Sequence, residues 1–240
     1  MISNPEGGRT TSTPRWSAVV ELAHRAVTGL RGKVLVGTTV LLGLAGAVAV
    51  SVGTPPSSRT FALTSMAVQL LMSVTVPFFD VLLTAHRSTA GRGALAPRLL
   101  AAVALAAAFA VFGVAVSAVA LVVAPSSAPG GGWQNAGAVA VGSVVVQVVA
   151  QLTGTGLGLL LRPPGAAMLA TVVLPLGLWL VLGAVAALQP AQAWLTPFPV
   201  AGQLLSGQLR ASGWAQALVV LLIWGGGLNA LGAWRVRRLR

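Results

Sequence analysis

Few side chains in this 240-residue sequence could carry out acid–base or metal chemistry. The only histidines are His24 and His86, and the only acids are Glu6, Glu21 and Asp80. There is no cysteine, so disulfides and thiolate metal sites are excluded. A zinc site or a catalytic pair of carboxylates cannot be assembled from so few groups. We therefore expect no catalytic, metal or cofactor site, and we expect that the chain is not an enzyme.

A phosphate-binding loop of the P-loop type is also missing. The segment Gly29-Leu30-Arg31-Gly32-Lys33 comes nearest to it. It has Val34 where the motif needs a hydroxyl, and Val27 where it needs the first glycine. Any ATP hydrolysis would therefore take place on a separate chain.

Asp80 is the one acid close to a long apolar run. Ionisable residues inside a membrane mark ion pathways, so a proton or cation relay is one hypothesis. We favour the other, in which the Asp80 carboxylate pairs with a nearby arginine at the membrane interface. Gln147, Gln151 and Thr153 interrupt a second apolar run. They could line a polar path, but such groups more often bond to a neighbouring helix.

The composition indicates which solvent surrounds these residues. Apolar residues make up 56% of the chain and charged residues 8%, whereas soluble domains carry roughly a quarter charged residues. Apolar stretches recur at the length of about 20 residues that a bilayer-spanning helix needs. The net charge of +12 would suggest nucleic acid in a soluble protein. Because the cations lie at the ends of apolar runs, we expect membrane lipid as a partner and no nucleic acid.

The sequence thus predicts an all-α polytopic membrane protein in four parts. Residues 1–12 are expected to be a disordered tail. Residues 13–33 have Thr13 and Pro14 as a helix start and apolar residues at three- and four-residue spacing, which predicts an amphipathic helix in the membrane interface. A transmembrane domain follows over 34–234, and a basic cytoplasmic tail over 235–240. The predicted spans are 34–52, 61–83, 99–124, 136–161, 166–188 and 214–233.

The segment between the fifth and sixth spans is too long for a turn and too apolar for an ordinary loop. Trp194 and Phe198 are among its apolar residues, while Pro197 and Pro199 prevent one continuous helix. An unstructured external loop would expose this apolar surface to water. We therefore expect a re-entrant hairpin of two short helices that dips into the outer leaflet.

Positive charge is distributed unevenly between the two sides of the predicted bundle. With six spans, thirteen of the fifteen lysine and arginine residues fall on one side, and only Arg59 and Arg210 on the other. The side rich in cations is normally the cytoplasm, which places both termini there. The bias toward arginine, alanine and glycine indicates a bacterial source, so the expected location is the bacterial plasma membrane.

This order of parts resembles the permease subunit of a type-2 ABC exporter over nearly the whole chain, from Pro14 to Arg240. The shared features are an interfacial helix, six spans, a cytoplasmic connector after the second span and an outer hairpin. The resemblance implies a homodimer that forms a translocation path with an ABC ATPase on separate chains. It also implies that the connector, with Asp80, His86, Arg87 and Arg92, couples the subunit to the ATPase.

The connector departs from the family pattern. It lacks the Gly-Thr pair usual there, it is short, and it contains Gly91 and Gly93, which are poor helix formers. The alternative function is therefore a non-transporting membrane protein, such as an immunity or scaffold factor, that keeps the same frame.

Overall fold

The computed structural model describes residues 15–85, 95–208 and 210–238, and these residues form helices joined by turns and loops. Six of the helices are long and apolar enough to cross a bilayer. This confirms an all-α protein of the multi-span membrane class. The long helices are α2 (Leu30–Gly53), α3 (Phe61–Ala85), α4 (Leu95–Val123), α5 (Ala136–Leu160), α6 (Pro164–Ala184) and a continuous last helix composed of α9 (Ala211–Val220), the π-helical segment η2 (Leu221–Gly227) and α10 (Leu228–Arg238).

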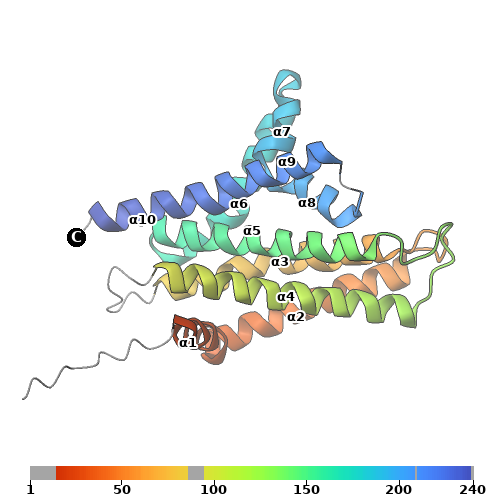
Figure 1. The fold of residues 1–240 in the computed structure, drawn as a ribbon, viewed down its shortest axis with the longest axis horizontal. Helices are drawn as coiled ribbons and strands as arrows, with labels where there is room; N and C mark the ends of the chain where they lie inside the picture. Colours follow the sequence, from red (N-terminus) through yellow and green to blue (C-terminus); the bar gives the residue numbers. More distant parts are fainter. Residues whose placement is uncertain (1–14, 86–94, 209, 239–240) are drawn as a thin grey trace, which may run out of the picture.

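Helices α3 and α5 form the centre of the bundle. They pack against each other, α2 and α4 lie against α3, and α10 lies against α5 (Figure 1). The turn between α5 and α6 and the end of α10 lie at the same end of the bundle (Figure 1). We call this the Arg-rich end, since Arg162, Arg235, Arg237 and Arg238 occur in these segments. The loops 54–60 and 124–135 lie at the opposite end, which we call the loop end (Figure 1).

The central pair of helices can approach closely because of a glycine. A Cβ atom added to Gly154 of α5 would lie 2.3 Å from the carbonyl oxygen of Pro77 on α3 and 2.7 Å from its Cα. Side chains with a Cβ do not fit against backbone at such distances, so the contact requires glycine. The sequence prediction that Gly154 serves packing within the bundle agrees with this contact.

A short helix precedes the bundle. Helix α1 (Arg15–Thr28) runs crosswise to the long helices at the Arg-rich end and packs on α4, α2 and α3 (Figure 1). It buries Val19 and Ala26, and it exposes the ion pair between Glu21 and Arg25, which are four residues apart. The predicted helix over 13–33 is interrupted at Gly29, whose backbone is extended. Residues 30–33 therefore belong to α2, and the predicted tail at 1–12 lies outside the described residues.

The chain between the fifth and sixth long helices is helical but broken. Helix α6 diverges from the bundle toward its C-terminal end (Figure 1) and stops at Ala184, since Val185 is extended. A short 3₁₀ turn leads into α7 (Gln189–Leu195), and α8 (Pro197–Ser206) follows after the extended residue Thr196. The predicted fifth span, which reached residue 188, is thus cut short by this break.

Candidate functional site

A stripe of buried polar residues runs along the contact between α3 and α5. On α5 it consists of every fourth residue, and all four side chains are at most 2% exposed. Four residues of helix rise about 6 Å, so the stripe covers about 18 Å, more than half of a bilayer core of about 30 Å. Its members on α5 are Ser143, Gln147, Gln151 and Thr155, and they contact Gln69 and Asp80 on α3.

The middle of this polar stripe joins three helices. The Gln147 side-chain nitrogen donates to the side-chain oxygen of Gln69 at 2.8 Å and to its backbone oxygen at 3.0 Å. The Gln69 nitrogen in turn donates to the carbonyl oxygen of Ala110 on α4 at 3.0 Å. This bears out the expectation that Gln147 bonds to a neighbouring helix. The Gln151 amide lies close to the Asp80 carboxyl and interacts with it electrostatically, although it forms no full hydrogen bond among the described residues.

Asp80 ends the polar stripe near the Arg-rich end. Its side chain is only 3% exposed, and its carboxylate accepts a hydrogen bond from the Thr155 hydroxyl of α5. Arg98 on α4 acts on this carboxylate electrostatically, but the two form no ion pair within the described part of the chain. Among the described residues, Asp80 is therefore tied to α5 more directly than to an arginine. The spacing of Thr155, four residues after Gln151, was the signal in the sequence that could have identified this partner.

Three of the four residues predicted to couple the chain to an ATPase belong to the connector that follows α3 in the sequence. His86, Arg87 and Arg92 lie outside the described residues, between α3 and α4. Asp80 itself lies one and a half turns before the last residue of α3, Ala85. Among the described residues, no three histidine, aspartate or glutamate side chains gather into a possible metal site.

The residues of the predicted hairpin lie on two short helices. Trp194 belongs to α7, and Pro197, Phe198 and Pro199 form the first turn of α8. The Trp194 and Phe198 side chains are each 41% exposed. The Phe198 ring contacts Trp179 of α6 edge-to-face, with ring centroids 6.3 Å apart. Hence the start of α8 is held against α6.

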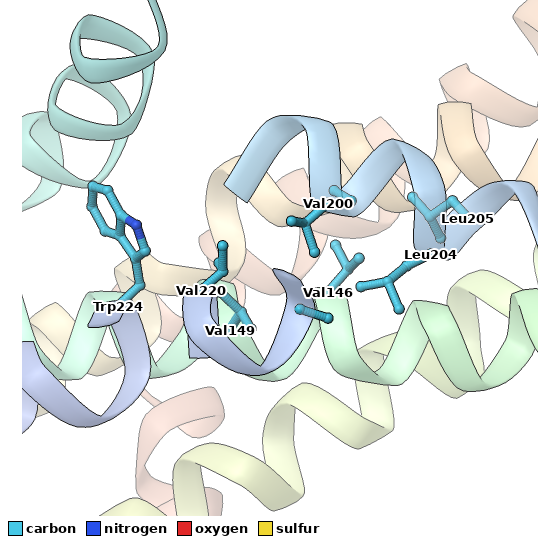
Figure 2. Packing of buried hydrophobic residues seen from close by; sticks show 9 residues of the cluster. Val146, Val149, Val200, Leu204, Leu205, Val220 and Trp224 are labelled. Carbon is cyan, nitrogen blue, oxygen red and sulfur yellow. The ribbon is translucent and has the colours of Figure 1, made fainter. Parts of the chain in front are cut away.

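Helix α8 returns to the bundle through an apolar cluster. Figure 2 shows Val200, Leu204 and Leu205 of α8 above Val146 and Val149 of α5. The last long helix completes the cluster with Val220 and Trp224 (Figure 2). The Trp224 indole nitrogen donates to the Leu195 carbonyl at 2.9 Å. The helix pair α7–α8 is therefore anchored to α5 and to the last helix, with α8 packed into the body of the protein.

A cavity of about 120 Å³ lies beside this cluster, between α3, α5, α6, α8 and α9. Its described lining is uncharged and mostly apolar. Pro77 and Pro175 line it together with Ser73 and Thr171, the residues four positions before them. Proline has no N–H, so the carbonyls of Ser73 and Thr171 lack their usual helical donor. The cavity can thus hold an apolar group.

Comparison with known proteins adds no identity to this picture. No family model, no curated protein and no solved structure matches the chain. The helices themselves establish a multi-span membrane protein with six candidate transmembrane helices.

Proposed function

We propose that this chain is the membrane-spanning subunit of an ATP-driven exporter of the type-2 ABC kind. The observation that carries the proposal is the order of elements: a crosswise amphipathic helix, then six long apolar helices, with the broken pair α7–α8 inserted before the last one. In this reading α1 lies in the membrane interface and α7–α8 form the re-entrant hairpin. Two copies form the path, and each binds one ATPase chain.

The orientation of the subunit follows from its charges. The Arg-rich end faces the cytoplasm, where lysine and arginine are normally retained. The loop end faces outward, with the α7–α8 pair in the outer half of the membrane. Nucleotide is hydrolysed in the cytoplasm, so the ATPase contacts the Arg-rich end.

The interior of the bundle supports a substrate with an apolar portion. The cavity beside α8 is uncharged and bounded by three prolines, Pro77, Pro175 and Pro197. Pro77 and Pro175 lie inside α3 and α6, and helices interrupted by proline can bend at such points. A change in the angle of α6 relative to α3 and α5 would therefore alter the cavity, which gives the ATPase a mechanical means to act on a bound substrate.

Coupling through the connector between α3 and α4 provides the test. Exposed ion pairs contribute about 0.2–1 kcal/mol each, so single changes of Arg87 or Arg92 to alanine should be mild. The double variant Arg87→Glu with Arg92→Glu adds repulsion as well. We expect it to abolish stimulation of the ATPase by the membrane subunit, whereas Arg87→Lys with Arg92→Lys keeps it.

The measurement is ATPase activity of the reconstituted complex, with maleimide labelling as a check on insertion. Normal stimulation in a correctly inserted double glutamate variant would refute coupling by this connector. If neither the unaltered chain nor its variants stimulate an ATPase, the non-transporting alternative is favoured instead. The glycines at positions 91 and 93 also favour that alternative.

A further inference from the structure

A groove lies on the outside of the bundle, and it shares no lining residue with the cavity beside α8. It has a volume of about 660 Å³, within the range of roughly 300–1,000 Å³ usual for ligand sites. Leu99, Leu100 and Val103 of α4 form one wall, the last long helix forms the other, and Leu152 of α5 lies between them. Both α4 and α10 pack on α5, which separates them in Figure 1.

The groove exists because the last helix carries small residues along it. Gly225, Gly226, Ala230 and Ala233 line this wall, where larger side chains would fill the space. A Cβ atom added to Gly226 would meet no other atom within 4 Å, so the backbone there tolerates a side chain. Gly225 and Gly226 belong to the π-helical segment η2, and π-helical turns occur often at functional sites.

The groove ends in positive charge. Arg237 lines it at the Arg-rich end, together with Trp234. The Arg238 guanidinium lies 4.0 Å from the centroid of the Trp234 ring. In the part of the chain that the structure describes, Arg237 forms no ion pair, so its charge is free to bind an anion. The site therefore combines an apolar channel with a cation and an indole ring at its mouth.

We propose that this groove binds an anionic phospholipid, with its phosphate at Arg237 and its acyl chains along the wall formed by η2 and α10. Basic pockets between transmembrane helices bind anionic head groups in this way. Tryptophan favours the depth of the lipid head groups, which places Trp234 beside the phosphate. The proposal does not depend on the export function.

Charge distinguishes this occupant from a second copy of the chain. A second copy would bring another net charge of +12, and the whole sequence has only the acids Glu6, Glu21 and Asp80. Glu21 already pairs with Arg25, and Asp80 is buried. A copy seated in the groove would hence repel Arg237 more than it could neutralise it, whereas an anionic lipid neutralises it directly.

The test is competition between two lipids on the intact, full-length protein. Purified protein is exposed to equal amounts of phosphatidylglycerol and phosphatidylcholine with the same acyl chains, and the retained lipids are counted by native mass spectrometry. One basic residue near a phosphate corresponds to a preference of roughly fivefold for the anionic lipid. Arg237→Gln should lose this preference and Arg237→Lys should keep it. Arg210→Gln, at the loop end, should also keep it.

A second pair of variants tests the channel. Gly226→Leu fills the groove and should reduce retention of both lipids, whereas Gly227→Leu is the matched control, because Gly227 does not line the groove and its added Cβ meets only the Leu222 oxygen at 3.5 Å. Equal retention of the two lipids by the unaltered protein would overturn the proposal. So would an Arg237→Gln variant with unchanged preference, or a Gly226→Leu variant that changes subunit number and leaves lipid retention as it was.

Discussion

Arg59 illustrates how a single residue can have a role that charge counting does not reveal. Its side chain is 8% exposed, and its guanidinium donates to four carbonyls at the loop end. Two of these, from Ser51 and Thr54, are at the end of α2 at 2.7 and 2.8 Å. The others, from Ala124 and Pro125, follow α4 at 3.1 and 3.4 Å. A cation is favourable where carbonyls at helix ends lack partners.

Replacing Arg59 should therefore destabilise the bundle at this end. Arg59→Met removes every one of these hydrogen bonds and leaves the carbonyls unpaired, which should cost about 2–4 kcal/mol. Arg59→Lys keeps the charge but not the fork of donors, so it should recover only part of the loss. Thermal unfolding in detergent measures both variants. Arg210→Met is the control. If Arg59→Met melts at the same temperature as Arg210→Met, these hydrogen bonds contribute nothing to stability.

The contact between Asp80 and Thr155 makes a second prediction at the residue scale. Thr155→Val keeps the shape of the side chain but leaves the buried carboxylate without its hydroxyl donor. We expect a loss of stability of about 1–2 kcal/mol, and Thr155→Ser should restore most of it. Thr153→Val is the matched control, because the Thr153 hydroxyl bonds only within its own helix, to the Val149 carbonyl at 2.8 Å. If Thr155→Val is as stable as Thr153→Val, the hydrogen bond to Asp80 does not contribute to stability.

Some features of these residues are predictable from the sequence, and others are not. The shortage of titratable groups and the polar interruption at Gln147 and Gln151 are visible in the sequence because they depend on composition. The burial of Asp80 is not, since it depends on the register between α3 and α5. That register is set by close contacts such as that of Gly154 with Pro77, which involve residues far apart in the chain.

At the scale of elements, the contact of α3 with α5 depends on Gly154. Gly154→Ala would place a Cβ atom 2.3 Å from the Pro77 oxygen, so the helices must separate, at a cost of about 1–3 kcal/mol. Gly137→Ala, in the first turn of the same helix, meets nothing within 4 Å and should be neutral or slightly stabilising. Melting temperatures of the two variants in detergent provide the comparison. A Gly154→Ala protein as stable as Gly137→Ala would mean that this contact does not set the helix spacing.

The long helices were predictable from the sequence, whereas their breaks were less so. Apolar runs of bilayer length identify α2 to α6 directly, because a polar backbone must be satisfied within each helix in lipid. The break at Gly29, the break at Val185 and the π-helical turn over Leu221–Gly227 have no comparable signal in the apolar pattern. Tertiary contacts also act there: within the π-helical turn, the Trp224 indole nitrogen donates to the distant Leu195 carbonyl.

At the scale of the whole molecule, the proposed orientation can be measured because the chain has no cysteine. Single cysteines at Ser57, Ser127 and Gln208, exposed at or next to the loop end, should react with an impermeant maleimide in intact cells. Cysteines at Ala90 and Arg238 should react only after the membrane is opened. Labelling at position 90 in intact cells would contradict the six-span orientation. Gly130 and Gly207 are unsuitable sites, since their φ angles of 85° and 68° disfavour a side chain.

The central claim is that this subunit works as a pair with separate ATPase chains, and the mass of the intact complex tests it most directly. The full-length protein is purified from its own cells in nanodiscs and measured by native mass spectrometry, with each chain identified by sequence. The proposal predicts two copies of this chain with two copies of a chain that has a P-loop. A single copy that remains alone under conditions where transport persists would contradict it.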